Sequence, residues 1–463
     1  MNVPPLSSLP QALLNDLHVR FGERCSTALV VREQHGRGES PYPAMSPDVV
    51  VYAESSEEVQ YVLVMCHAQH VPVIAFGAGS SLEGQLLATR GGVCLDLSRM
   101  NRIVRIDAND FTATVQAGVS KEQLNAALRS EGLFFPVDPG AHASIGGMAA
   151  TRASGTNTVR YGSMRENVLA LSVVMADGRV VRTGTRAVKS AAGYDLTRLF
   201  VGSEGTLGVI TEVTLRLFPL PESVSAAVIT FADPHGAVNT VVNAIQSGLP
   251  IARSEYLCAA SIRAINAATP ELALRERPTL FMEFHGSPAS LEEQISLLRE
   301  IALEHAGEDF QWAERPEDRT RLWQARHNAY FSCRQVRAGA QIITTDTCVP
   351  RSQLAPSIEG AAAIMSKASF PYMIFGHVGD GNFHVLMVVD PDSEAEREEA
   401  ESFNEAIVHL ALSMDGTCTG EHGIGYHKKA FLLREAGEPA VELMQQIKAA
   451  LDPHGILNPD KIF

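Results

Sequence analysis

Three glycine-rich segments in the first half of the chain limit most strongly what it can fold into. They are Phe76–Gly84 (FGAGSSLEG), Pro139–Gly147 (PGAHASIGG) and Gly202–Ile210 (GSEGTLGVI). Glycine lets successive backbone N–H groups approach a ligand closely and surround a phosphate. The first segment follows the apolar run VPVIAF directly, which favours a strand that leads into a pyrophosphate-binding loop. None of the three has the GxGxxG spacing of a Rossmann nucleotide site, so a different nucleotide-binding domain is expected.

The pattern of expected strands and helices divides the chain into two domains and two smaller segments. A length of 463 residues exceeds what one ordinary core accommodates. Residues 1–45 have a helical start and a polar linker, and strands alternate with helices over residues 46–221. The pattern changes after PLPES, and residues 222–415 form a new α+β pattern. The last segment, 416–463, is rich in turn residues, and we expect it to pack back on the cofactor domain.

Composition excludes several classes of function. The formal net charge of −15 argues against a nucleic-acid partner, although an acidic surface also suits a basic redox protein. The seven cysteines lack CxxC spacing, which argues against a disulfide framework and an iron–sulfur cluster. No apolar run approaches the ~20 residues that span a bilayer, and Asp16 and Glu23 make a transit peptide unexpected. We therefore expect a cytoplasmic protein, with membrane association through its electron acceptor as the alternative.

The segment Tyr372–Val389 (YMIFGHVGDGNFHVLMVV) is the most informative part of the second half. It has two β-rich runs around Asp380-Gly381, which is a strong signal for a two-residue hairpin turn. Counting outward from that turn places His377 opposite His384. Directly opposed residues share a face of the sheet, with Cβ atoms ~4.5–5.5 Å apart. This separation suits two imidazoles that share one metal ion.

A third metal ligand is expected from Glu421 in the segment TGEHGIG. Two histidines and one carboxylate with open coordination positions are typical of a catalytic metal site. Zn²⁺ is the default expectation, and Mn²⁺ or Fe²⁺ would suit the same ligands. The alternative is that His377 and His384 are only a packed cross-strand pair. The Gly-Asp-Gly turn and the glycine-flanked Glu421-His422 weigh against that alternative.

The glycine-rich half resembles the FAD-binding domain of the vanillyl-alcohol oxidase and p-cresol methylhydroxylase superfamily. The matching stretches are VIAFGAGSSLEG, VDPGAHASIGGMAATRASGTNTVRYG and LFVGSEGTLGVITEVTLRL, in this order. The resemblance implies an α+β fold, in which a PCMH-type FAD-binding domain has two α/β subdomains. Because the pyrophosphate loop has no histidine, noncovalent FAD is expected. His142 and Cys94 are the less favoured attachment points.

The same resemblance assigns three sets of FAD-binding residues. The pyrophosphate set is Gly77, Ala78, Gly79, Ser80, Ser81 and Leu82. The flavin and ribityl set is Pro139, Gly140, Ser144, Gly146, Gly147, Gly155 and Gly162. The adenine set is Glu204, Gly208 and Ile210, and Asn458 near the C-terminus is a further cofactor-binding candidate.

The second half resembles the FAD-linked oxidase C-terminal domain. The residues that carry this resemblance are GHVGDGNFH, GEHGIG, WQARHNAYFS, TTDTCVP and the ending LDPHGILNPDKIF. That domain occurs in cytochrome-linked D-lactate dehydrogenases, glycolate oxidase flavin subunits and D-2-hydroxyglutarate dehydrogenases. The resemblance implies a substrate domain with an antiparallel sheet. It also implies oxidation of a small D-2-hydroxy acid to the 2-keto acid, by hydride transfer to flavin N5.

Each step of this reaction has a candidate residue. A metal ion held by the three ligands would chelate the carboxylate and hydroxyl of the substrate and lower the hydroxyl pKa. His422 is the candidate general base, because an imidazole pKa of ~6.5 suits proton abstraction at neutral pH. Arg326, in WQARH, matches the arginine that binds the substrate carboxylate in the family. Asn382 is a further substrate-binding candidate.

Substrate choice depends on two positions where this chain departs from the hydroxyglutarate enzymes. Those relatives have an asparagine and a lysine where this chain has Leu386 and Thr344. Leu386 gives a second substrate carboxylate no partner, and an unpaired buried charge is costly. D-lactate or D-2-hydroxybutyrate is therefore expected. Tyr330, one helical turn after Arg326, is expected to form a wall of the pocket. The resembling D-lactate enzymes have a tryptophan at this position, and the smaller tyrosine would admit larger hydroxy acids.

Four other functions remain as alternatives. A glycolate oxidase flavin subunit or a D-2-hydroxyglutarate dehydrogenase would use the same mechanism, and the former would need iron–sulfur partner subunits. An alkylglycerone-phosphate synthase-like flavoprotein would need a lipid tunnel, and a non-catalytic flavin-binding module would need no metal. The electron acceptor is open between a cytochrome, a quinone, an electron-transferring flavoprotein and an iron–sulfur partner subunit.

Overall fold

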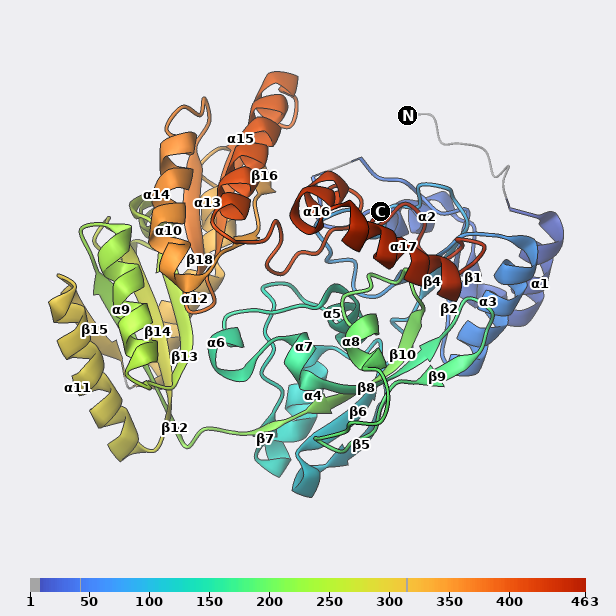
Figure 1. Cartoon of the computed structure of the whole chain (residues 1–463), viewed down its shortest axis with the longest axis horizontal. Helices are drawn as coiled ribbons and strands as arrows, with labels where there is room; N and C mark the ends of the chain where they lie inside the picture. Colours follow the sequence, from blue (N-terminus) through green and yellow to red (C-terminus); the bar gives the residue numbers. More distant parts are fainter. Residues whose placement is uncertain (1–8, 42, 314) are drawn as a thin grey trace. The chain divides into compact units, whose positions relative to one another are not determined.

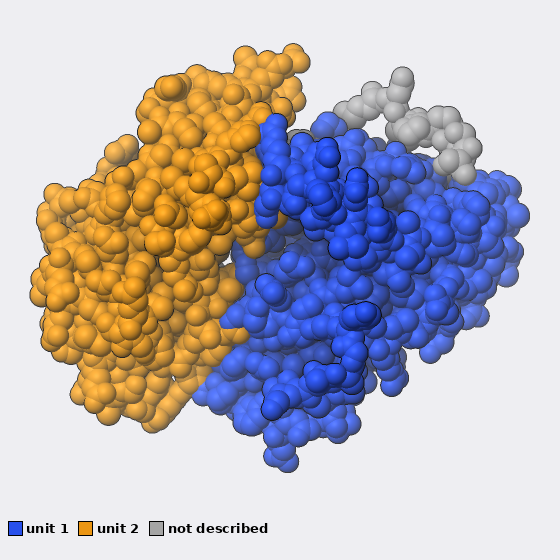
Figure 2. Space-filling view, in the orientation of Figure 1, with its two compact units in different colours: residues 1–154, 162–220, 421–463 blue, residues 155–161, 221–420 orange. Residues whose placement is uncertain are grey.

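The computed structural model describes residues 9–41, 43–313 and 315–463 (Figure 1). Contacts divide the chain into two compact units, which Figure 2 shows in two colours. Unit 1 comprises the chain up to Ser154, Gly162–Leu220 and Glu421–Phe463. Unit 2 comprises Gly155–Tyr161 and Pro221–Gly420. Two domain boundaries differ from those expected from the sequence. Gly155–Tyr161 belongs to unit 2, and the chain returns to unit 1 after Gly420 instead of after residue 415.

A four-stranded sheet forms the first half of unit 1. Its order is β1-β2-β4-β3, in which β2, β4 and β3 are parallel and β1 is antiparallel. The strands are β1 (Cys25–Ser26), β2 (Val49–Tyr52), β3 (Val73–Phe76) and β4 (Val93–Asp96), and the helices are α1 (Gln11–Phe21), α2 (Leu29–His35) and α3 (Ser56–Gln69). The Ser55 hydroxyl accepts the N–H of Glu58, so Ser55 is the N-cap of α3. Leu13 and Leu17 of α1 are fully buried in the core of this sheet.

A five-stranded antiparallel sheet forms the second half of unit 1. Its order is β5-β6-β10-β8-β9. The strands are β5 (Ile103–Asp107), β6 (Thr112–Gln116), β8 (Val168–Val174), β9 (Val180–Arg182) and β10 (Val209–Arg216). A separate two-stranded sheet pairs β7 (Leu133–Phe134) with β11 (Phe218–Pro219). The helices are α4 (Lys121–Leu128), α5 (Ile145–Thr151), α7 (Met164–Asn167) and α8 (Leu196–Phe200).

The C-terminal segment belongs to the core of unit 1. It contains α16 (Lys429–Ala436) and α17 (Glu438–Leu451). Ile447 and Leu451 of α17 pack against the core of the five-stranded sheet. Leu457 is fully buried in the core of the four-stranded sheet, where it forms an isolated bridge with Val73. The segment therefore joins both sheets of the cofactor unit.

Unit 2 is built on an eight-stranded antiparallel sheet. The order is β15-β12-β14-β13-β18-β19-β16, and β17 also pairs with β19. The strands are β12 (Ser223–Thr230), β13 (Ile251–Leu257), β14 (Thr279–Gly286), β15 (Glu308–Ala313), β16 (Gln341–Thr344), β17 (Thr347–Cys348), β18 (Tyr372–His377) and β19 (Asn382–Val389). The short helix α6 (Thr158–Tyr161) contacts β13.

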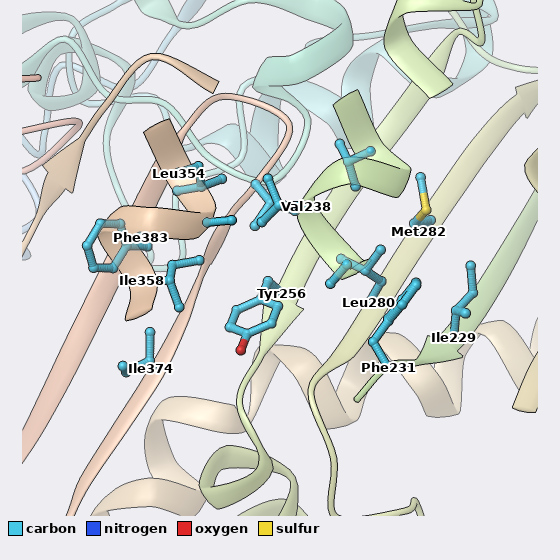
Figure 3. Close-up of a cluster of buried hydrophobic side chains, with 14 of the residues drawn as sticks. Ile229, Phe231, Val238, Tyr256, Leu280, Met282, Leu354, Ile358, Ile374 and Phe383 are labelled. Atoms are coloured by element: carbon cyan, nitrogen blue, oxygen red, sulfur yellow. The ribbon is translucent and has the colours of Figure 1, made fainter. Parts of the chain in front are cut away.

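The two faces of this sheet are covered by different helices. One face packs against α9 (Pro234–Gln246), α11 (Pro288–Glu304), α14 (Leu354–Met365) and α15 (Glu394–Ser413). Figure 3 shows this core, with Val238 of α9 and Ile358 of α14 beside Tyr256 and Phe383 of the sheet. The other face packs against α10 (Ala259–Ala268), α12 (Pro316–His327) and α13 (Ala329–Arg334). Alternate residues along each strand therefore enter two separate apolar cores.

We predict that α1 contributes to the stability of unit 1. Leu17→Ala should lower the free energy of unfolding by about 2–5 kcal/mol, because the side chain is fully buried. Val19→Ala on the same helix is the control, since Val19 is 89% exposed and its truncation should change stability by less than about 0.5 kcal/mol. Chemical denaturation measures both values. Equal stability of the two variants would show that α1 does not belong to the core.

Candidate active site

The hairpin β18–β19 is present, but its turn is longer than the sequence analysis expected. Asp380 N–H donates to His377 O (2.9 Å), and Gly381 follows with φ +85°, so four residues connect the strands. His384 consequently pairs with Phe375, and the predicted direct opposition of His377 and His384 is wrong. The physical reason is that a four-residue turn with Gly381 in the left-handed region joins the strands in place of the expected two-residue turn, which shifts the strand register.

The two histidines nevertheless share one face of the sheet. The pairing shifts by two residues relative to the expectation, and a shift of two preserves the face to which each side chain points. The ring centroids of His377 and His384 are 5.7 Å apart, with an angle of 85° between the ring planes. His384 Nδ1 donates to Thr345 O (3.0 Å), so Nε2 would be the nitrogen that binds the predicted metal ion.

A buried carboxylate that the sequence analysis missed lies behind His377. Glu255 of β13 pairs with His377 across the sheet and is fully buried. Its Oε1 lies 2.5 Å from His377 Nδ1, and its Oε2 accepts from Arg326 Nε (2.9 Å) and Nη2 (2.5 Å). Burial alone would raise the pKa of Glu255, but Arg326 and His377 hold that pKa below its ordinary value. An acidic residue inside the strand-like segment RSEYLC was the available signal.

Asp346 is a second buried carboxylate near the histidines. Its Oδ1 lies 3.8 Å from His384 Nδ1 and accepts from Asn382 Nδ2 (3.0 Å). Its Oδ2 accepts from the hydroxyl of Thr419 (2.7 Å). Asn382, a predicted substrate-binding residue, therefore also orients this carboxylate, and its Nδ2 donates to Thr347 O as well (2.9 Å).

The predicted ligand Glu421 and the predicted base His422 begin the last segment of unit 1. Glu421 accepts from the hydroxyl of Ser154 (2.6 Å), and His422 Nδ1 lies 3.3 Å from Glu83 Oε1. Glu83 is buried and also pairs with Lys428 Nζ (2.9 Å). Burial would raise the pKa of Glu83, but Lys428 and His422 lower it, so this carboxylate is charged beside the imidazole.

Four side chains of metal-ligand type are thus divided between the units. Asp346 and His384 belong to unit 2, and Glu421 and His422 belong to unit 1. Unit 2 holds Gly420, the residue that precedes Glu421, through a hydrogen bond from Gly420 N to Asp346 O (3.2 Å). Glu421, the predicted third ligand, therefore directly follows a residue whose backbone is bound to Asp346.

The predicted substrate-binding side chains lie on the sheet face with α10, α12 and α13. Arg326 is buried in α12, with its guanidinium 4.7 Å from the centroid of the Phe375 ring. Tyr330 packs against the same apolar core, but it belongs to α13. The expected single helix is therefore interrupted between the two residues at Asn328, which is the residue before α13. Leu386 is buried in this core and pairs with Thr344 of β16.

The predicted pyrophosphate loop, Gly77–Leu82, follows β3 directly. A Cβ at Gly77 would lie 2.4 Å from the hydroxyl of Ser144, and Gly79 has φ +78°. Ser144 caps α5 by accepting the N–H of Gly147. The loop with Ala78 and Ser80 and the first turn of α5 are therefore in contact, and only glycine at position 77 permits this approach.

Buried polar atoms in unit 1 fit a polar cofactor. Among the described residues, the hydroxyls of Ser81 and Ser203 and the side-chain oxygen of Asn458 are buried without a hydrogen-bond partner. Asn458 Nδ2 donates to Glu204 O (2.7 Å) and to Gln85 O (3.1 Å), so Asn458 joins the third glycine-rich segment to the residue that follows the first. Such buried polar atoms need partners, and the phosphate, ribityl and adenine groups of a bound FAD would supply them.

Other predicted cofactor residues have different surroundings. A Cβ at Gly208 would lie 2.4 Å from Val173 Cγ1, and Ile210 is buried in the core of the five-stranded sheet. Gly146 approaches Ala117 closely, and Gly155 belongs to unit 2. Gly162 has φ +77°, and Pro139 and Gly140 lie in the loop before α5. The carboxylate of Glu204 accepts from the N–H groups of Ile424 and Gly425, each at 2.8 Å.

Family comparisons match both halves of the chain. The model described as "FAD binding domain" matches residues 47–184, and the model described as "FAD linked oxidases, C-terminal domain" matches residues 220–462. The chain belongs to the FAD-linked oxidase family, as the resemblance indicated. It therefore carries an FAD-binding domain.

Curated relatives cover almost the whole chain. A protein named probable mitochondrial D-lactate dehydrogenase from Danio rerio is 50% identical over 95% of this chain and 89% of its own length. A mitochondrial D-lactate dehydrogenase (cytochrome) from Arabidopsis thaliana is 44% identical over 98% of this chain and 80% of its own length. A glycolate oxidase subunit from Bacillus subtilis is 34% identical over 92% of this chain and 90% of its own length.

Solved structures share the fold at low sequence identity. The p-cresol methylhydroxylase structure has a TM-score of 0.82 at 16% identity and covers 98% of both chains. An alkyldihydroxyacetonephosphate synthase structure has a TM-score of 0.77 at 17% identity, with 99% of this chain and 86% of that chain covered. The predicted α+β fold with a PCMH-type FAD-binding domain is confirmed.

The expected cytoplasmic location is contradicted by the relatives. The proteins from Danio rerio, Arabidopsis thaliana, Saccharomyces cerevisiae and Kluyveromyces lactis all carry the word mitochondrial in their names. The expectation failed because free cysteines indicate reducing surroundings and do not distinguish one reducing compartment from another. Within the described residues, no helix is both long and apolar enough to cross a bilayer.

We predict a pH-dependent stability of unit 1 that depends on Glu204. Burial raises the pKa of Glu204 to about 7 from an ordinary value of 4.5. Between these values the folded protein keeps a proton that the unfolded chain has lost, so the free energy of unfolding falls as pH rises. Relative to Glu204→Gln, the wild type should lose about 2 kcal/mol between pH 5 and pH 8.

Chemical denaturation of the FAD-loaded wild type and of Glu204→Gln at both pH values measures this effect. The glutamine variant does not titrate at position 204, so it controls for all other ionisable groups. A difference between the two proteins that does not change with pH would contradict the raised pKa.

Proposed function

We propose that this chain is an FAD-dependent dehydrogenase that oxidises D-lactate, or a similarly small D-2-hydroxy acid, to the 2-keto acid. One observation carries the proposal: His377, His384 and Arg326 lie on one sheet face beside the buried carboxylate of Glu255. Three relatives named D-lactate dehydrogenase, at 40–50% identity over 91–98% of this chain, support the substrate class.

The same site would hold a divalent metal ion. We propose His377, His384 and Glu421 as its ligands, with Zn²⁺ as the first candidate and Mn²⁺ or Fe²⁺ as alternatives. Both histidines use Nδ1 for a partner within unit 2, so each would bind through Nε2. Asp346 adds a carboxylate next to His384, which strengthens the preference of the site for a cation.

The chain's own residues divide the chemistry between them. Arg326 binds the substrate carboxylate. Two of its five N–H donors, on Nε and Nη2, bind Glu255, and the remaining donors provide a paired geometry for the substrate carboxylate. His422 accepts the hydroxyl proton, and the charged Glu83 orients its ring and stabilises the protonated form. When bound, the metal would polarise the hydroxyl, and noncovalent FAD would accept the hydride at N5.

Leu386 favours a short substrate side chain. It is buried in an apolar core together with Met373, Phe375 and Trp323. A second carboxylate at this position would be desolvated without a partner, which costs several kcal/mol. This argument favours D-lactate over D-2-hydroxyglutarate, and Tyr330 on α13 would limit the size further.

We propose a cytochrome as the electron acceptor, because the relatives from Arabidopsis thaliana and Saccharomyces cerevisiae are named for one. A quinone, an electron-transferring flavoprotein or an iron–sulfur partner subunit is the alternative. A glycolate oxidase subunit is the second candidate function, because the relative from Bacillus subtilis is named for one. The likeness to alkyldihydroxyacetonephosphate synthase at 17% identity concerns the fold alone.

Anaerobic mixing with D-lactate, L-lactate, D-2-hydroxyglutarate and glycolate tests the proposed function. We expect D-lactate to bleach the flavin absorbance, and we expect chelator treatment to abolish bleaching until Zn²⁺ or Mn²⁺ is restored. Bleaching only by glycolate or hydroxyglutarate would keep the mechanism and overturn the substrate. No bleaching by any hydroxy acid, with flavin and metal bound, would refute a dehydrogenase.

The paired positions Thr344 and Leu386 should set the substrate preference. We expect Thr344→Lys with Leu386→Asn to raise kcat/KM for D-2-hydroxyglutarate by at least about tenfold, because both new side chains provide a partner for the second carboxylate. Leu386→Met keeps an apolar side chain of similar volume and should leave the preference unchanged. Steady-state kinetics with an artificial acceptor measures both; an unchanged preference in the double variant would contradict the account.

A further inference from the structure

Glu255 lies at the centre of the candidate site, although it was not among the residues expected to act there. We propose that Glu255 is a positioning residue whose two carboxylate oxygens hold a metal-binding histidine and the substrate-binding arginine at the same time. Oε1 contacts His377 Nδ1, and Oε2 contacts Nε and Nη2 of Arg326. This inference rests on the proposed function.

The burial of Glu255 makes both partners necessary. The residue is fully buried, and a carboxylate in such surroundings is costly unless charged or polar groups satisfy its oxygens. Arg326 is itself buried and lies with its guanidinium against the Phe375 ring, which restricts the plane of the guanidinium. The carboxylate, the arginine and the ring therefore determine one another's orientation.

The contact with His377 has a consequence for metal binding. A carboxylate that binds Nδ1 of an imidazole fixes the ring orientation and the tautomer in which Nε2 faces the metal. Loss of such a partner typically weakens metal binding about 10–100-fold. Because the other oxygen holds Arg326, the same substitution should also disturb binding of the substrate carboxylate. Glu255 would thus connect metal binding by His377 of β18 with substrate binding by Arg326 of α12.

A second buried cluster on the next strand has the same residue types and provides a matched control. Glu283 of β14 lies 2.9 Å from His285 Nε2 and 3.3 Å from Arg253 Nε. The other nitrogen of His285, Nδ1, contacts the hydroxyl of Tyr161 (2.7 Å). Both ring nitrogens of His285 are thus engaged within the protein. The Glu283 cluster is therefore structural, although its composition is that of the Glu255 cluster.

The test compares Glu255→Gln, Glu255→Asp and Glu283→Gln with wild type, each as the full-length FAD-loaded chain. Zn²⁺ affinity is measured by competition with a chromophoric chelator, and kcat and KM for D-lactate are measured at saturating Zn²⁺. For Glu255→Gln we expect Zn²⁺ affinity to fall about 10–100-fold and KM to rise about tenfold with a smaller change in kcat. Glu255→Asp keeps the charge with a shorter reach and should lie between Glu255→Gln and wild type.

The outcomes separate this inference from the proposed function. A wild type that binds FAD but neither binds Zn²⁺ nor oxidises D-lactate refutes the proposed function. An active wild type with a Glu255→Gln variant that keeps both its Zn²⁺ affinity and its KM, or changes only one of them, overturns the role of Glu255. Equal Zn²⁺ losses in Glu255→Gln and Glu283→Gln would also overturn it, because they would indicate a general effect on the fold.

A measurement on the wild type covers the case in which Glu255→Gln does not fold. Proton NMR of the Zn²⁺-loaded protein should show a far-downfield imidazole N–H resonance from the short contact between His377 and Glu255. The resonance should disappear in His377→Gln and persist in Glu283→Gln. Absence of any resonance that depends on His377 would overturn the proposal.

Discussion

The buried carboxylate of Glu255 is the interaction on which the candidate site depends. It lies on a central strand of the unit 2 sheet and pairs with Arg326 of α12 and with His377 of β18. A buried charge of this kind tolerates no loss of a partner. The sheet register, the position of α12 and the orientation of the histidine ring are therefore constrained together. The apolar core that contains Leu386 lies on the same face of this sheet.

The second constraint comes from backbone proximity in unit 1. The loop after β3 and the start of α5 approach so closely that Gly77 has no space for a side chain. Asn458 Nδ2 and the N–H of Ile424 both donate to Glu204, which connects the C-terminal segment to the third glycine-rich segment. The last segment of the chain is therefore part of the cofactor unit, and it carries Glu421 and His422 at its start. This connection explains why catalytic candidates follow immediately after the residue where the chain leaves unit 2.

Much of the fold was predictable from local patterns. The three glycine-rich segments, the change of pattern near Pro221 and the hairpin with His377 and His384 are visible in the sequence because they depend on nearby residues. The hairpin register was not, because a four-residue turn with a left-handed Gly381 and a two-residue Asp-Gly turn have the same composition. Alternation preserved the shared face of the two histidines, even though their direct opposition was wrong.

Contacts between distant segments were harder to predict. Glu255 lies 71 residues from Arg326 and 122 residues from His377, and no local pattern links three such positions. Asp346 lies in the segment TTDTCVP, which was noted only for its family resemblance, whereas the structure shows its carboxylate bound to Asn382 and Thr419. The break between α12 and α13 was also missed, since Arg326 and Tyr330 have helical spacing.

The proposed reaction breaks the substrate C–H bond at carbon 2 during flavin reduction. Rapid anaerobic mixing of the metal-loaded protein with D-lactate and with D-lactate deuterated at carbon 2 tests it most directly. Both compounds should reduce the flavin, and the deuterated compound should do so several-fold more slowly, because the transferred hydrogen is the labelled one. Failure of D-lactate to reduce the flavin of a protein that holds both FAD and metal would contradict it.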